Sequence, residues 1–127
     1  MSRNARKYRR LNAPQDIQWK LGDQKLSGTT KLVDVSLLGA SFQVDQPFTV
    51  QRAVTFDLES SELPSLPKQA KLRWYRKAGN DYPPKFLVGV VFQGSVSAEW
   101  TSWIAELEHK EEQAEEQQEK ELVAVRA

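Results

Sequence analysis

Apolar and polar side chains alternate along six short stretches of this chain. Residues 17–21 are the clearest case, because Ile17, Trp19 and Leu21 are apolar and the two residues between them are polar. Alternation with a period of two predicts strands that bury one face. The expected strands lie within residues 17–21, 25–35, 40–44, 54–59, 70–75 and 86–92, and in the fifth of them Ala70, Leu72 and Trp74 share the apolar face.

Turn-forming residues separate the expected strands. Gly22 and Gly39 each follow one, two prolines fall within residues 60–67, and residues 79–84 contain glycine, asparagine and a Pro-Pro pair. Glycine and proline interrupt regular structure, so these segments are expected to be turns and loops. No segment with helical periodicity lies between the strands, which argues against a parallel α/β sheet. The pattern therefore predicts an all-β fold, an antiparallel barrel or a sandwich.

The periodicity changes after Gly94. Apolar residues then recur at the spacing of one helix face, and Ser95 or Ser97 is available to cap the first turn. We expect this C-terminal helix to lay its apolar face over the open end of the barrel, as ordinary core packing. That face consists of Trp100, Trp103, Ile104 and Leu107.

Composition limits the chemistry available to the chain. The 127 residues suffice for one compact domain, and the absence of cysteine excludes disulfides and thiolate metal sites. His109 is the lone histidine. No metal or cofactor is therefore expected, and no residues supply a base, a nucleophile and an oxyanion site together, so an enzyme is not expected either. No apolar run approaches the roughly 20 residues that span a bilayer, and a signal peptide is not apparent, so a cytoplasmic location is expected.

Charge is distributed unevenly along the chain, although the formal net charge is only +1. Residues 1–10 contain five basic side chains and no acidic one, whereas residues 106–121 contain eight glutamates and two lysines. This polarity indicates a flexible basic arm over residues 1–13 that binds anions, and a solvated Glu/Gln-rich tail, helical or disordered, over residues 108–127. The barrel and its capping helix are expected between them, over residues 14–107.

Two local clusters carry candidate chemistry. In the arm, Arg6 and Arg10 lie four residues apart, and guanidinium groups match phosphate oxygens or the O6 and N7 edge of guanine. After the second strand, Asp34 offers a carboxylate that accepts hydrogen bonds from a guanine, and Ser36 offers a small hydroxyl. Gly39 permits a positive φ or a close backbone approach to a ligand. A guanine nucleotide would satisfy both clusters.

These clusters resemble the signature of PilZ domains, in which RxxxR near the N-terminus is followed by [D/N]xSxxG. Here 23 residues separate Arg10 from Asp34, in the expected order. The resemblance extends to an apolar strand after the motif glycine, at residues 39–42, and to a Gly-Val-Val-Phe strand at residues 89–92 before the helix. It covers roughly residues 6–107, and the two motifs together are more specific than either is alone.

The resemblance implies a six-stranded antiparallel PilZ-type β-barrel that binds the bacterial second messenger cyclic di-GMP. It assigns phosphate and guanine contacts to Arg6 and Arg10 in the arm, and the cradle for a guanine to Asp34, Ser36 and Gly39. Lys7 and Arg9 lie inside the arm motif and are possible additional contacts. In the family the arm changes conformation when the ligand binds, and the receptor then signals to a protein partner. One ligand or an intercalated pair per site, and the oligomeric state, remain open.

Two other functions are compatible with these residues. The first is a PilZ-like adaptor that recognises proteins and no longer binds nucleotide. The second is a small-barrel RNA or DNA binder that uses the basic arm, against which the acidic tail argues because it would repel a polyanion. We therefore expect cyclic di-GMP and a protein effector as partners, with no nucleic acid and no insertion into a membrane.

Overall fold

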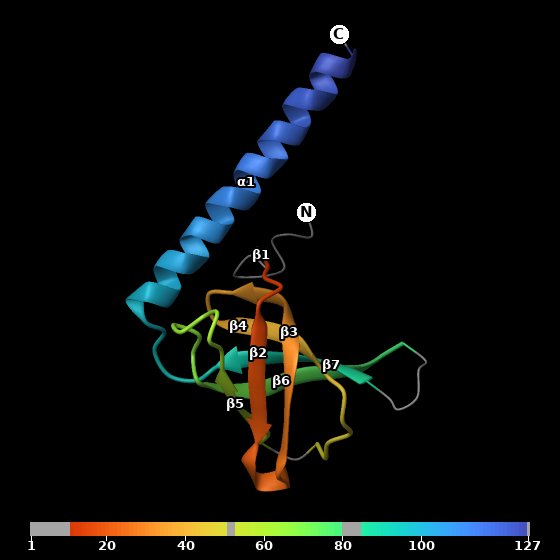
Figure 1. The fold of residues 1–127 in the computed structure, drawn as a ribbon, viewed down its shortest axis with the longest axis vertical. Helices are drawn as coiled ribbons and strands as arrows, with labels where there is room; N and C mark the ends of the chain where they lie inside the picture. The colour runs from red at the N-terminus through yellow and green to blue at the C-terminus, as the bar shows by residue number, and fades with distance from the viewer. Residues whose placement is uncertain (1–10, 51–52, 80–84, 127) are drawn as a thin grey trace.

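The computed structural model describes residues 11–50, 53–79 and 85–126 of the chain. Seven strands precede one long C-terminal helix that rises away from them (Figure 1). The elements are β1 (Leu11–Asn12), β2 (Asp16–Leu21), the 3-10 helix η2 (Gly22–Gln24), β3 (Leu26–Ser36), β4 (Gly39–Val44), β5 (Thr55–Glu59), β6 (Gln69–Ala78), β7 (Lys85–Phe92) and α1 (Ala98–Arg126).

Six of the strands form a closed barrel. The hydrogen-bonded order is β3-β2-β5-β6-β7-β4, and a further pairing between β3 and β4 closes the sheet on itself. Every neighbouring pair is antiparallel. Closure leaves no unpaired sheet edge, which is the general advantage of a barrel. The predicted six-stranded antiparallel barrel with a C-terminal helix is therefore confirmed.

The predicted alternation places the core inside this barrel. Along β2, Ile17, Trp19 and Leu21 are buried and the intervening polar residues are exposed. Phe42 and Phe56 are fully buried and meet edge to face, with ring centroids 5.3 Å apart. Aromatic rings favour this geometry, and their burial supplies much of the hydrophobic stabilisation of a small core.

The outer face of the β2–β3 pair carries polar cross-strand contacts. Asp16 lies opposite Lys31, and the Lys31 ammonium donates to the Asp16 carboxylate over 2.9 Å. This hydrogen bond and the negative charge of Asp16 raise the pKa of Lys31 above its usual value. Because both side chains are exposed, the ion pair contributes little to the stability of the fold.

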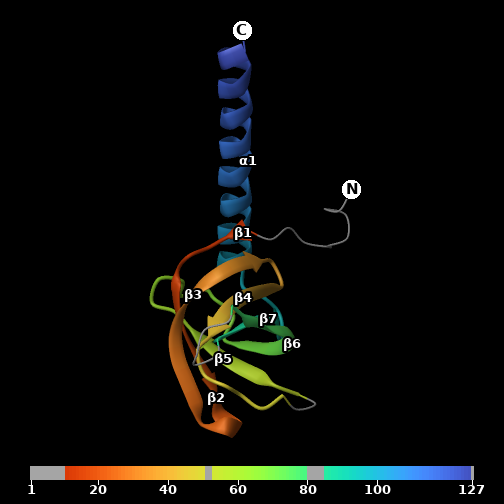
Figure 2. The same cartoon turned by 90° about the vertical axis from the view of Figure 1, so that its right-hand side faces the viewer.

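Helix α1 covers one end of the barrel and then continues beyond it (Figures 1 and 2). The Ser97 hydroxyl accepts a hydrogen bond from the Trp100 backbone N–H, which confirms one of the two expected caps. Trp100 and Ile104 are buried, and Trp103 and Leu107 pack partly against the core, as the helical spacing predicts. The helix runs on through the Glu/Gln-rich segment to Arg126, so the backbone of the tail is helical.

The N-terminal strand β1 brings residues of the expected arm onto the barrel. Leu11 and Ala13 are almost completely buried, and β1 pairs with the end of β3. The backbone N–H of Asn12 donates to Oε1 of Glu111 on α1 over 3.1 Å. The arm was expected to include residues 1–13, but burial of Leu11 and Ala13 attaches residues 11–13 to the barrel.

Candidate functional site

The hairpin between β3 and β4 carries the Asp-x-Ser-x-x-Gly sequence. Ser36 and Gly39 form the last pair of the β3–β4 ladder, so residues 37 and 38 make a two-residue turn. Asp34 lies two residues before Ser36 and pairs with Ser41 on β4. The structure therefore brings the three predicted residues Asp34, Ser36 and Gly39 together on one tight hairpin.

Ser41 orients the carboxylate of Asp34. The Ser41 hydroxyl donates to Oδ1 of Asp34 over 2.8 Å, and Ser41 is only 2% exposed. A carboxylate accepts several hydrogen bonds, so this contact uses one site and aims the group without neutralising it. Ser41 lies outside the Asp-x-Ser-x-x-Gly motif. Only the cross-strand register identifies it, because seven positions along the chain separate it from Asp34.

Gly39 is required for a reason that differs from the expected one. Its φ is not positive, since the positive-φ glycines of the described residues are Gly79 and Gly94. A Cβ atom at Gly39 would instead lie 2.6 Å from the carbonyl oxygen of Val90 on β7. The close backbone approach is therefore to the neighbouring part of the barrel, and the absence of a side chain lets β4 sit against β7.

Replacing Gly39 with alanine is expected to destabilise the fold by about 1–3 kcal/mol, because a backbone carbonyl cannot move aside as a flexible side chain does. Chemical denaturation measures this change. Gly22→Ala is the matched control, since nothing lies within 4 Å of a Cβ atom placed there, and it should change stability by less than about 0.5 kcal/mol. Equal stabilities of the two variants would contradict the explanation.

The carbonyl groups of both turn residues accept hydrogen bonds, one from α1 and one from β7. The Leu37 carbonyl accepts a hydrogen bond from the indole N–H of Trp100 over 3.0 Å, and the Leu38 carbonyl accepts one from the backbone N–H of Phe92 over 2.8 Å. Ser36 contributes a longer contact of 3.5 Å from its hydroxyl to the Gly39 carbonyl. The hairpin is thus tied both to β7 and to the first turn of α1, which makes it a rigid platform.

Strand β1 leads the arm directly to this hairpin. Leu11 pairs with Val35, and Asn12 pairs with Asp34. The described chain therefore begins beside the hairpin, at Leu11. The predicted arm contacts all lie outside the described residues. They are Arg6, Lys7, Arg9 and Arg10.

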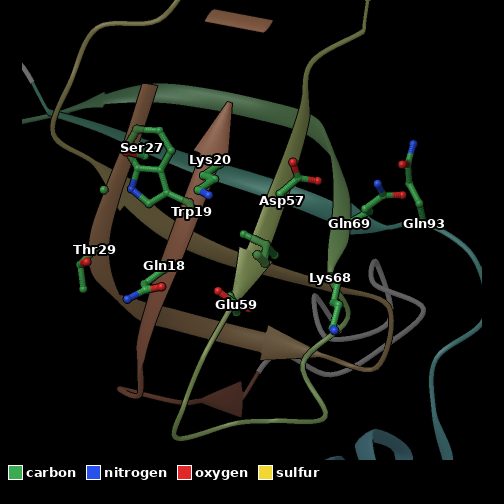
Figure 3. Close-up of a pocket in the computed structure, with 12 residues that line it drawn as sticks. Gln18, Trp19, Lys20, Ser27, Thr29, Asp57, Glu59, Lys68, Gln69 and Gln93 are labelled. Carbon is green, nitrogen blue, oxygen red and sulfur yellow. The ribbon is translucent and has the colours of Figure 1, made fainter. Parts of the chain in front are cut away.

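An open groove of about 820 Å³ lies elsewhere, over the outer faces of β2, β3 and β5 (Figure 3). Its charged lining is balanced, with Lys20 and Lys68 against Asp57 and Glu59. None of residues 34–41, at the turn end of the β3–β4 hairpin, lines this groove. Balanced charge does not favour an anionic ligand, so the hairpin is the better candidate site.

Two further features bear on what the chain can bind. Among residues 11–50, 53–79 and 85–126, no three acidic or histidine side chains gather as a metal site would require. Over the same described ranges, no helix has both the length and the apolar composition needed to cross a bilayer.

Comparison with solved structures supports the fold. The PilZ domain of YcgR from Escherichia coli, described with c-di-GMP, superposes with a TM-score of 0.60 and 21% identity over 87% of this chain and 97% of that one. The Bacillus subtilis inhibitor of motility MotI/DgrA gives a TM-score of 0.57 and 16% identity over 84% of this chain and 50% of that one. The Borreliella burgdorferi PlzA protein, in complex with c-di-GMP, gives a TM-score of 0.51 and 13% identity over 79% of this chain and 46% of that one.

This chain thus spans about half the length of the second and third of these proteins. A search of the curated proteins gave no match. The family model for the PilZ domain matches residues 4–102, a segment that runs from the basic arm through the barrel to the first residues of α1. Since this match covers most of the sequence, the chain belongs to the PilZ domain family.

Proposed function

We propose that this protein is a receptor for cyclic di-GMP, held between the basic arm and the β3–β4 hairpin. The observation that carries the proposal is the pairing of β1 with β3, which places Leu11 opposite Val35 and Asn12 opposite Asp34, directly after the RxxxR motif in the sequence. Two of the similar solved structures, those of YcgR and PlzA, are described with c-di-GMP. Membership of the family adds independent support.

Each proposed contact has a chemical reason. The Asp34 carboxylate accepts hydrogen bonds from the ring N–H and the exocyclic amine of a guanine, and Ser41 fixes its direction. The guanidinium groups of Arg6 and Arg10 bind phosphate oxygens or the O6 and N7 edge of a guanine. Lys7 and Arg9 add positive charge beside them. Ser36 offers a hydroxyl at the turn, and Gly39, which has no side chain, lets β4 pack against the Val90 carbonyl there.

The energetic cost of ordering the arm is limited by β1. Leu11 and Asn12 are already paired with β3, so the ligand does not need to order these two residues. Fixing a backbone costs about 1–2 kcal/mol per residue, and a hydrogen bond to a charged group contributes about 1.5–3 kcal/mol. Several ionic contacts from two arginines are sufficient to offset the ordering of a short arm.

The proposed receptor acts without a chemical step and signals through a change of arm conformation. The Trp100 indole joins the turn carbonyl of Leu37 to α1, so a displacement of the hairpin reaches the helix. Helix α1 extends past the barrel and offers a surface to a protein partner (Figure 1). As the sequence resemblance implies, the proposed setting is the cytoplasm of a bacterium.

Isothermal titration calorimetry with cyclic di-GMP tests the proposal and also measures the stoichiometry. Saturable binding in the micromolar range or tighter is expected. Cyclic di-AMP is the matched control, because adenine has neither the N1–H nor the C2 amine that guanine would donate to Asp34, and it should bind at least about tenfold more weakly. If the titration shows no binding of cyclic di-GMP at micromolar concentrations, the proposal is wrong.

The alternative is a protein–protein adaptor of the same fold that does not bind nucleotide. The continuation of α1 beyond the barrel favours it, because this part of the helix is available to a partner without any nucleotide. Affinity capture of partners in the presence and absence of cyclic di-GMP separates the two functions. Partners that bind equally well in both conditions, together with no binding in calorimetry, identify an adaptor.

A further inference from the structure

Strand β1 is held between the hairpin and helix α1. On one side β1 pairs with β3, where Asn12 lies opposite Asp34. The backbone N–H of Asn12 donates to Oε1 of Glu111 on α1 over 3.1 Å, a contact that joins residues 99 positions apart in the sequence (Figure 2). Asn12 therefore lies beside two acidic residues, one from the hairpin and one from the helix.

The side of α1 that faces the barrel changes from apolar to acidic where the helix reaches β1. Trp100 and Ile104 are buried, and Leu107 packs partly against the core. The next positions on this side are Glu108 and Glu111, four residues after Ile104 and Leu107, and both are half-buried. The acidic residues thus continue the face of α1 that packs on the barrel.

Acidic and basic residues are separated around α1. Spacings of three and four residues, which keep positions on one side of a helix, continue from Glu108 and Glu111 to positions 112, 115 and 119. We call this set the acidic stripe, and it consists of Glu108, Glu111, Glu112, Glu115 and Glu119. At about 3.6 residues per turn, Lys110 and Lys120 fall on the far side of the helix. The negative charge of α1 is therefore concentrated on the side where β1 lies.

The basic arm has the charge and the length to bind the acidic stripe. Residues 1–10 contain five basic side chains and no acidic one, and they precede the strand that contacts Glu111. Ten extended residues span at most about 36 Å, whereas the helix rises only about 12 Å between positions 111 and 119. Arginine and carboxylate groups form charge-assisted, often bidentate hydrogen bonds. Length, charge and side-chain chemistry therefore all match the arm to the stripe.

We propose that the acidic stripe of α1 is a docking surface for the basic arm of the same chain, and that cyclic di-GMP competes with the stripe for the arm. The competition rests on the proposed function, whereas docking of the arm requires no nucleotide. Exposed ion pairs are individually weak, so the arm dissociates from the stripe readily. The stripe therefore lowers the affinity for the ligand without abolishing binding.

A spin label in the arm tests the docking in the ligand-free protein. The chain has no cysteine, so a nitroxide attached to Ser2→Cys labels one site, outside the RxxxR motif. We expect this label to broaden the NMR signals of backbone amides along the acidic stripe, and the double variant Glu108→Gln and Glu111→Gln to lose most of the broadening. Glutamine keeps an oxygen that can accept from the Asn12 N–H, so β1 should stay in place.

The matched control is the double variant Glu99→Gln and Glu106→Gln. Both glutamates are exposed on α1, and helical spacing places them on the side opposite the acidic stripe. This variant removes the same charge from the same helix and should keep the broadening of the wild type. Equal broadening in the two double variants overturns the docking, whatever the affinity for cyclic di-GMP.

Calorimetry with cyclic di-GMP measures the competition. If the stripe binds the arm for roughly 80–90% of the time, its loss raises the affinity about 5- to 10-fold, which is the gain expected for Glu108→Gln with Glu111→Gln. The control variant should change the affinity by less than about twofold, because exposed charges are screened over about 8 Å. Equal gains in both variants would show general repulsion of the anionic ligand and overturn the competition. Failure of the wild type to bind overturns the proposed function, and the spin-label measurement still decides whether the arm docks.

Discussion

Replacing Arg6 and Arg10 together by alanine is expected to weaken cyclic di-GMP binding at least about 100-fold. Each guanidinium is proposed to make charge-assisted hydrogen bonds, which contribute about 1.5–3 kcal/mol apiece, and tenfold in affinity corresponds to about 1.4 kcal/mol. Titration calorimetry measures the change. The barrel should remain as stable as the wild type, because both arginines precede Leu11, the first residue that the structure describes on the barrel.

A charge-matched control separates direct contacts from long-range attraction. The double variant Arg3→Ala and Lys20→Ala also removes two positive charges, but Arg3 lies outside RxxxR and Lys20 lines the open groove of balanced charge. It should weaken binding by less than about threefold at physiological salt, since exposed charges are screened over about 8 Å. If both double variants lose the same affinity, the arginines act only through long-range electrostatic attraction and do not contact the ligand directly.

Trp100→Ala is expected to produce the largest loss of stability, about 3–5 kcal/mol. Trp100 is fully buried, meets the Phe92 ring edge to face with centroids 5.4 Å apart, and lies 5.1 Å from the Trp103 ring. The loss would be a large part of the roughly 5–15 kcal/mol that stabilises a typical domain. Urea denaturation monitored by circular dichroism measures it, and a loss under about 1 kcal/mol would contradict the packing described for α1.

The milder variant Trp100→Phe isolates the hydrogen bond to the hairpin. Phenylalanine keeps much of the ring packing but cannot donate a hydrogen bond to the Leu37 carbonyl. The missing hydrogen bond should lower the free energy of unfolding by roughly 1–2 kcal/mol, in addition to the loss caused by the smaller ring. Trp103→Phe is the matched control, because Trp103 is only partly buried against the core. Cyclic di-GMP affinity should fall in Trp100→Phe and not in Trp103→Phe, since Trp100 alone of the two holds the turn.

The strands and the hairpin could be predicted from local patterns. Alternation in residues 17–21 reflects a strand with one buried face, and the structure has β2 over Asp16–Leu21 with that face inward. The buried helix face with Trp100 and Ile104 could also be predicted, because helical spacing and serine capping are properties of a short segment. The motif residues Asp34, Ser36 and Gly39 were found on the predicted turn for the same reason.

Other features depend on residues that are distant in the sequence. Strand β6 has a bulge at Arg73 that depends on how this strand pairs with β7, and alternation along β6 alone places Trp74 on the wrong face. The contact of Ser41 with Asp34 likewise follows from the β3–β4 register. Leu11 was assigned to the arm because a two-residue strand has no periodicity to detect, and only its pairing with Val35 reveals it.

By itself, the sequence determined the all-β class, the approximate strand bounds, the capping helix and the motif that indicates the family, because each depends on residues close together in the chain. Tertiary structure alone decided why Gly39 must lack a side chain, since the Val90 carbonyl comes from another strand. It also decided that Asp34 and Glu111 both lie beside Asn12. Barrel closure sets which strands are neighbours, and no local pattern of apolar and polar residues specifies that register.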